Sequence, residues 1–130
     1  MRSKFTRCAG LIAASSLLCA LATADAIWID GTVAQLQALD KITARISTLT
    51  APIGKPIRFG TLEIIIQRCA FRPPEEPPEN AAFLEIADHG HDKTAPVKQV
   101  FSGWMFSSSP AVSAVEHPVF DVTLLGCVID

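Results

Sequence analysis

The sequence lacks the short motifs of the common hydrolases. It contains no Gly-x-Ser-x-Gly, no Ser-x-x-Lys and no His-Glu-x-x-His, the patterns that place a serine nucleophile on a sharp turn or two zinc ligands on a helix. An internal repeat and a convincing long helical pattern are also missing. These absences argue against the familiar hydrolase classes and against a helical or repeat architecture.

Basic residues are few and scattered. The chain has 11 Lys and Arg residues against 13 acidic residues, a net charge of −2, and no basic cluster follows the first seven residues. Such a surface gives phosphates and anionic lipid head groups little to bind. The sequence therefore predicts no nucleic-acid partner and no electrostatic binding to membranes.

The N-terminus carries the one long apolar run. Three basic residues within the first seven precede the apolar and small residues 8–24, a pattern typical of a secretory signal peptide over residues 1–24. We expect cleavage after Ala24, or after Ala26 at a second small-residue site, and export to the periplasm; an uncleaved membrane anchor is the alternative. Cleavage after Ala24 would leave eight basic and thirteen acidic residues, a net charge of −5, and no stable membrane span.

Two of the four cysteines lie in the predicted signal peptide. The remaining pair, Cys69 and Cys127, is an even number in a compartment that permits disulfides, so we predict that the two are bridged. Each falls out of phase with the apolar alternation before it, which predicts a β-bulge near Gln67 and Arg68 and another beside Gly126. Strands bent in this way can bring the two Cα atoms within the roughly 7 Å that a disulfide requires.

Short segments rich in β-branched and aromatic residues, with Pro and Gly between them, dominate the rest of the chain. We expect residues 25–40 to form a lead-in segment with a short strand or helical turn, and residues 41–130 to form a single all-β domain. The expected architecture is a small β-sandwich or a partly open barrel with one disulfide. About six strands are predicted, at residues 41–49, 57–59, 61–71, 81–86, 97–106 and, after a crossing connection over 111–116, beyond Pro118.

Several segments in a fixed order resemble a known family. They are ALDKITAR (38–45), FGTL (59–62), RPPEEPPE (72–79), AFLEI (82–86), FSGWMF (101–106) and EHPVFDV (116–122). From about residue 38 to residue 127 the chain resembles the domain of unknown function 2155 family, small exported proteins of alphaproteobacterial type. The resemblance implies a Gram-negative periplasmic setting, and it implies no activity, substrate, cofactor or catalytic residue.

The aromatic segment 101–106 is the first candidate binding site. Phe101, Trp104, Met105 and Phe106 fall on both faces of one predicted strand, so they are not all buried unless both faces are covered. An exposed aromatic face can stack sugar rings or receive a protein partner. Packing of these side chains into the core is the alternative.

A segment with four prolines and three acids is the second candidate. Pro73, Pro74, Pro77 and Pro78 donate no backbone hydrogen bonds, and we predict a stiff, polyproline-like arm. Such an arm can enter an aromatic groove on a partner. The alternative is a rigid exposed connector that keeps strand edges from pairing with other chains.

The histidines offer candidates for chemistry. His89 and His91 alternate with Asp88 and Asp92 at the tip of a predicted long hairpin, but a zinc site needs a third rigid ligand, and His117 is far away in the sequence. We therefore predict no metal ion and no other cofactor.

A serine, a histidine and an acid also occur within a short stretch near the C-terminus. His117 follows Glu116, and a nucleophile could come from Ser107, Ser108 or Ser109. Such a set occurs in almost any sequence, so no catalytic residue is assigned.

We predict a non-catalytic periplasmic module, binding or structural, that interacts with a cell-envelope protein or polymer. The alternative is a small periplasmic hydrolase or metal-dependent enzyme that acts on cell-wall material through His117 or through the histidines of the hairpin tip.

Overall fold

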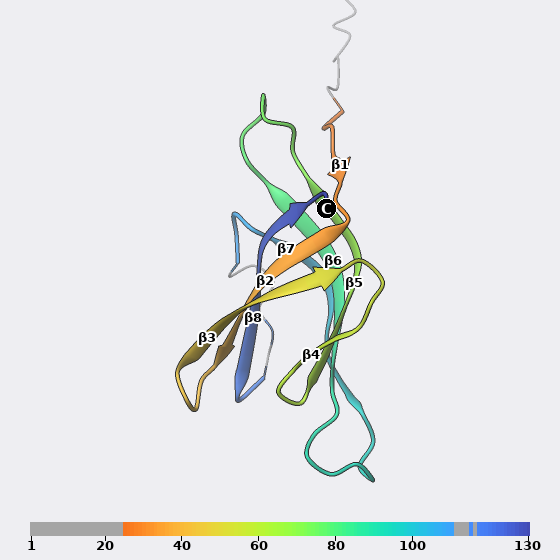
Figure 1. Cartoon of the computed structure of the whole chain (residues 1–130), viewed down its shortest axis with the longest axis vertical. Helices are drawn as coiled ribbons and strands as arrows, with labels where there is room; N and C mark the ends of the chain where they lie inside the picture. Colours follow the sequence, from red (N-terminus) through yellow and green to blue (C-terminus); the bar gives the residue numbers. More distant parts are fainter. Residues whose placement is uncertain (1–24, 111–114, 116) are drawn as a thin grey trace, which may run out of the picture.

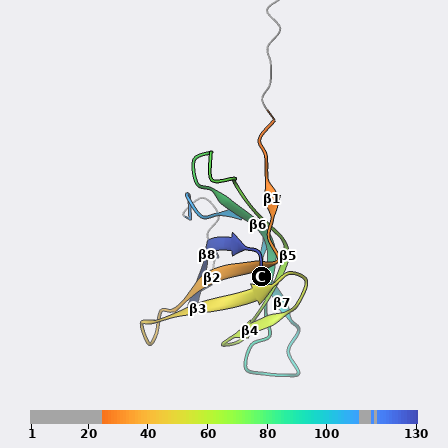
Figure 2. The same cartoon turned by 45° about the horizontal axis from the view of Figure 1, so that its top comes forward.

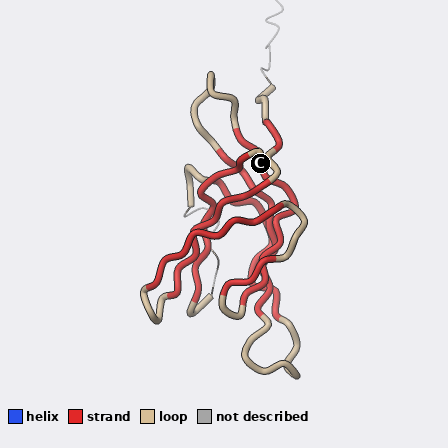
Figure 3. Tube along the Cα trace, viewed as in Figure 1, coloured by secondary structure: helices blue, strands red, loops and turns tan. Residues whose placement is uncertain are grey.

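The computed structural model describes residues 25–110, 115 and 117–130. The predicted signal peptide lies outside the described residues, as do Glu116 and most of the predicted crossing connection. No helix occurs in the described part, which confirms the all-β prediction (Figures 1 and 3). The strands are β1 (Ile29–Asp30), β2 (Val33–Asp40), β3 (Arg45–Pro52), β4 (Ile57–Phe59), β5 (Leu62–Phe71), β6 (Asn80–Asp88), β7 (Lys98–Phe106) and β8 (Phe120–Val128). Among these residues, no helix is long and apolar enough to cross a membrane.

The strands form two antiparallel sheets that pack face to face. The larger sheet has the order β1-β5-β6-β7, with β4 also pairing with β5, and the smaller sheet has the order β3-β2-β8. Figure 2 shows β2 and β3 running across β1 and β5. The sheets do not close into a barrel, so the sandwich is the form that the fold takes.

The core lies between the inner faces of the two sheets. Period-two alternation places Leu62, Ile64 and Ile66 of β5 on one buried face, next to Leu84 and Ile86 of β6, and all five are 0% exposed. Leu36 of β2 and Val122 of β8 cover them from the smaller sheet. Burying branched side chains of this kind stabilises a fold by roughly 1.5–3 kcal/mol each.

Bulges bring the two cysteines together as predicted. The pairing of β5 with β6 shifts between Ile66 and Arg68, and the pairing of β2 with β8 shifts so that Leu125 is skipped, beside Gly126. The Cα atoms of Cys69 and Cys127 lie 5.6 Å apart, and the disulfide joins β5 of the larger sheet to β8 of the smaller one. The predicted bridge and both predicted bulges are confirmed.

The N-terminal part of the domain differs from the sequence prediction. Residues 33–40, expected within the lead-in segment, form β2, the central strand of the smaller sheet. The strand predicted over 41–49 begins only at Arg45, because the Asp40 carboxylate accepts hydrogen bonds from the backbone N–H groups of Ile42 and Thr43 and fixes a turn there. Ile42 lies in this turn and is 77% exposed.

Candidate functional site

The outer face of the larger sheet carries an apolar groove. Directly paired residues of an antiparallel sheet share a face, and the pair Ala82 and Met105 faces the core, so the neighbouring pair Ala81 and Phe106 faces outward. Ala70 pairs with Ala81 in the same row. The groove encloses about 240 Å³. We call it the aromatic groove; it is lined by Trp28, Arg68, Ala70, Ala81, Trp104 and Phe106.

Both tryptophans of the chain line this groove. Trp28 precedes β1 and Trp104 lies in β7, the strands at the two ends of the sheet order, and Trp104 is 40% exposed. The Trp104 ring meets Phe83 edge-on at 5.5 Å, and the Arg72 guanidinium lies 4.6 Å from the centre of the Trp28 ring. Aromatic and cation–π contacts of this kind orient the rings. The result is two aromatic walls above a floor of small alanines.

The four aromatic-strand candidates therefore divide between the two faces of β7. Trp104 and Phe106 lie on the outer face, as a binding surface requires. Met105 is only 3% exposed and Phe101 packs against the core, so the prediction that these two belong to the binding surface is wrong. Alternation along the strand is the physical reason, because neighbouring side chains point to opposite faces.

Trp28 and Arg68 were missed by sequence reasoning. Trp28 lies in the expected lead-in segment, outside every strand that the sequence predicted. Arg68 follows the bulge in β5 and makes an ion pair with Asp30, with 3.0 Å between Arg68 Nη2 and Asp30 Oδ1. This pair is exposed, so it contributes little to stability, but it places a donor and an acceptor group at the rim of the groove.

The Pro–Glu segment, residues 72–79, is a closed hairpin loop and not an extended arm. Arg72 N–H donates to the Glu79 carbonyl at 3.0 Å, and Glu76 N–H donates to the Pro73 carbonyl at 3.1 Å, which closes a turn. An ion pair of 2.8 Å between Arg72 and Glu76 spans that turn. The prediction of a polyproline-like arm is therefore wrong, because these contacts fold the segment back on itself. Of the four prolines, Pro74, Pro77 and Pro78 are exposed and Pro73 is half-buried.

Arg72 links this loop to the aromatic groove. Its guanidinium pairs with Glu76 inside the loop and at the same time lies over the Trp28 ring. The loop thus positions one wall of the groove, a role that its sequence did not indicate.

His117 is a buried side chain whose two ring nitrogens both have partners. Nε2 lies 2.8 Å from Asp88 Oδ2, and Nδ1 accepts the backbone N–H groups of Val119 and Phe120 at 3.0 and 3.1 Å. Because Nδ1 is an acceptor, the proton is on Nε2, which donates to Asp88. The imidazole therefore has no nitrogen left to accept a proton from a substrate, and its role is to hold the start of β8 against the end of β6.

The Asp88 carboxyl is held in its ionised form. Burial raises its pKa, but hydrogen bonds from Thr61, His117 and the Gly90 backbone outweigh that effect and lower the pKa from 3.8 to about 2. Asp88 thus stabilises the fold as a carboxylate.

Replacing Asp88 with Asn should therefore lower the free energy of unfolding by about 2 kcal/mol at pH 7. A carboxyl group whose pKa is lower in the folded than in the unfolded chain stabilises the fold when the pH lies above its ordinary pKa. This stabilisation is lost as the pH falls from about 4 to about 2. Urea titrations of both proteins across this range should show the difference shrinking. A difference that stays constant down to pH 2 would contradict the assignment.

The serines considered as nucleophiles lie far from His117. The hydroxyls of Ser107 and Ser108 donate to the Glu79 carboxylate beside the start of β6, whereas His117 contacts Asp88 at its end. Eight steps of extended chain separate the two ends of β6, about 26 Å. The structure does not bring Ser107 or Ser108 together with this histidine.

The residues of the hairpin tip also divide among different partners. His89 Nε2 lies 3.1 Å from the Glu63 carboxylate, and Asp92 accepts hydrogen bonds from the N–H and hydroxyl of Thr94. Asp88 binds His117 instead of facing His91. Within the described ranges, no three His, Cys, Asp or Glu side chains converge as metal ligands.

Comparison with known proteins identifies a family without a described function. The chain is 29% identical over 90 residues to an uncharacterized protein of Rickettsia prowazekii (strain Madrid E), a match that covers 69% of this chain and 57% of that relative. The chain thus spans little more than half the length of that relative. No solved structure shows significant similarity to this chain. Residues 34–127 match the family described as "Uncharacterized protein conserved in bacteria (DUF2155)", and the chain therefore belongs to this family.

Proposed function

We propose that the protein is an exported, non-catalytic module that binds a polysaccharide of the cell envelope in the aromatic groove. The observation that carries this proposal is the convergence of both tryptophans, from opposite ends of the larger sheet, on one outer-face groove with an alanine floor. Export is supported by the basic and apolar N-terminal pattern and by the disulfide, which forms and persists outside the cytoplasm.

The chemistry of the groove suits a sugar ring. The apolar face of a pyranose stacks on aromatic side chains, and the small side chains of Ala70 and Ala81 leave room for the ring to approach the sheet. The exposed pair of Asp30 and Arg68 supplies an acceptor and donors for hydroxyl groups, and it carries no net charge. A volume of about 240 Å³ is below the range of pockets for drug-sized molecules, which suits one ring of a polymer.

The geometry of the histidine and serine candidates supports a non-catalytic role. Both nitrogens of His117 are bonded within the fold, and Ser107 and Ser108 lie at the other end of β6. No observation in the described residues favours the alternative of a hydrolase or a metal-dependent enzyme acting on cell-wall material.

Replacing Trp104 with Ala tests the proposal. Truncating an aromatic anchor typically costs about 2 kcal/mol of binding, so the affinity for the polymer should fall roughly thirtyfold. Co-sedimentation with isolated peptidoglycan and with other envelope polysaccharides measures this affinity. The matched control is Ile46→Ala, which removes an exposed apolar side chain, 62% accessible, from the smaller sheet.

Two outcomes would contradict the proposal. Equal retention of the wild type and the Trp104→Ala protein would show that the polymer binds elsewhere. If no envelope polysaccharide retains the wild type, while crosslinking through the same face captures an envelope protein, the ligand class is wrong and the surface is a protein interface.

A further inference from the structure

A second cavity lies at the other end of β5 and β6 from the aromatic groove. It encloses about 610 Å³ between the β4–β5 turn and the loop that joins β6 to β7, residues 89–97. Figure 3 shows this loop and the Pro–Glu loop at opposite ends of the larger sheet. We call it the cationic pocket; it is lined by Arg58, Gly60, Thr61, His89, Gly90, His91, Lys93, Ala95, Val97 and Phe120.

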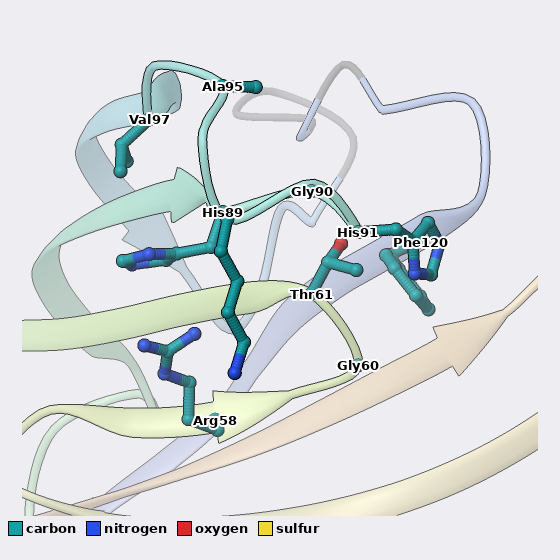
Figure 4. Close-up of a pocket in the computed structure, with 10 residues that line it drawn as sticks. Arg58, Gly60, Thr61, His89, Gly90, His91, Ala95, Val97 and Phe120 are labelled. Carbon is teal, nitrogen blue, oxygen red and sulfur yellow. The ribbon is translucent and has the colours of Figure 1, made fainter.

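The charged side chains of this lining are all basic or imidazole groups. Figure 4 shows Arg58 and His89 on one side of the pocket and His91 beside Phe120 on the other. Lys93 also lines the pocket, and no acidic residue does so. The chain as a whole has more acidic than basic residues, so a pocket lined by basic residues without acidic ones differs from its average composition.

The acidic residues nearest in sequence are already engaged. Glu63 pairs with Arg58 at 3.3 Å and with His89 at 3.1 Å, so it offsets one positive charge at the edge of the pocket. Asp88 is bonded to His117, and Asp92 to Thr94 within its own loop. In the part of the chain that the structure describes, Lys93 makes no ion pair, so its ammonium group is free to bind a ligand.

The opposite wall is apolar and rigidly held. The Phe120 ring stacks on His117 at 5.2 Å and meets Phe59 edge-on at 5.4 Å. Gly60 passes so close to that ring that no side chain would fit between them. The pocket therefore combines fixed apolar surface with nearby cations.

We propose that the cationic pocket binds a phosphate group, with Arg58 and Lys93 as its main ligands. The planar guanidinium of Arg58 can donate two parallel hydrogen bonds to phosphate oxygens, and Lys93 adds a compact positive charge. The ring or chain that carries the phosphate packs on Phe120 and Val97. This site is separate from the aromatic groove and does not depend on the sugar-binding proposal.

Titration of the purified protein with inorganic phosphate, followed by amide NMR at constant ionic strength, tests the site. Chemical shifts should change for residues 58–61 and 89–97 and should saturate. Arg58→Gln and Lys93→Gln should each weaken phosphate binding about tenfold. Lys55→Gln is the control, because Lys55 is an exposed lysine outside the pocket, and it should leave the affinity unchanged. The same spectra show whether each variant remains folded.

The phosphate group could belong to a lipid head group or to a soluble molecule, and binding to vesicles distinguishes the two. Co-sedimentation with phosphatidylglycerol-containing vesicles, but not with phosphatidylcholine vesicles, and its loss in Arg58→Gln would identify a lipid head group. Saturable binding of inorganic phosphate without vesicle binding would identify a soluble ligand. Shifts that are absent, or that are equal in the wild type and in both pocket variants, would overturn the proposal.

Discussion

Replacing both Cys69 and Cys127 with Ser should lower the free energy of unfolding by about 4 kcal/mol. The bridge closes a loop with a sequence separation of 58 residues and joins the two sheets. Without the bridge the unfolded chain has far more conformations, so its entropy stabilises the unfolded state, whereas the folded state has no such gain. Guanidinium titrations of the wild type and the double variant measure the difference.

A reducing agent provides the matched control for this prediction. It should destabilise the wild type by a similar amount and leave the double-serine protein unchanged. If the variant unfolds at the same denaturant concentration as the oxidised wild type, the bridge does not constrain the chain as the structure indicates. A value well below about 4 kcal/mol would point to residual structure in the unfolded chain.

Replacing Gly60 with Ala should lower the free energy of unfolding by about 3 kcal/mol, the second-largest effect that we expect. Gly60 has a φ of 58°, which costs a residue with a side chain about 1–2 kcal/mol. An added Cβ would also lie 2.9 Å from Phe120 Cε1 and closer still to Cζ. That ring is packed between Phe59 and His117, so it cannot move aside without cost.

A substitution at Gly54 separates the cost of the positive φ from the cost of the clash with Phe120. It has a φ of 77°, but an added Cβ would meet nothing within 4 Å. Gly54→Ala should therefore show the backbone cost alone, about 1 kcal/mol. Thermal or urea unfolding of the two variants gives the comparison. Equal effects would mean that the Phe120 ring yields easily, and the rigid wall of the cationic pocket would then be wrong.

The parts of the fold that follow from local patterns could be predicted from the sequence. Alternation of branched residues in β5 indicates a strand with one buried face, and the break in that alternation before Cys69 indicates the bulge that the structure contains. The two cysteines that remain after removal of the predicted signal peptide are an even number, which predicts the disulfide. Each of these inferences needs only neighbouring residues or a count.

The features that sequence reasoning missed depend on contacts between distant residues. The prolines of residues 72–79 suggest an extended arm, and only the pairing of Arg72 with Glu76 and Glu79 folds them into a loop. Likewise, the mixed aromatic segment predicts an exposed face, but not that Trp28 would supply its second wall.

The cationic pocket was hidden for the same reason. Arg58 and Lys93 are 35 positions apart in the sequence, so no cluster of basic residues is visible there. They line one pocket because β5 and β6 run antiparallel and bring the β4–β5 turn beside the end of β6. The scattered basic residues of the sequence therefore gave no sign of this pocket.

The central claim is that the aromatic groove binds a sugar polymer, and intrinsic fluorescence tests it most directly. The chain has two tryptophans and no tyrosine, and both tryptophans line the groove. Titration with soluble fragments of a retained polysaccharide should shift or quench the emission and should saturate, because the rings lose contact with water. Binding detected by calorimetry in the same solution without any change in emission would contradict the claim.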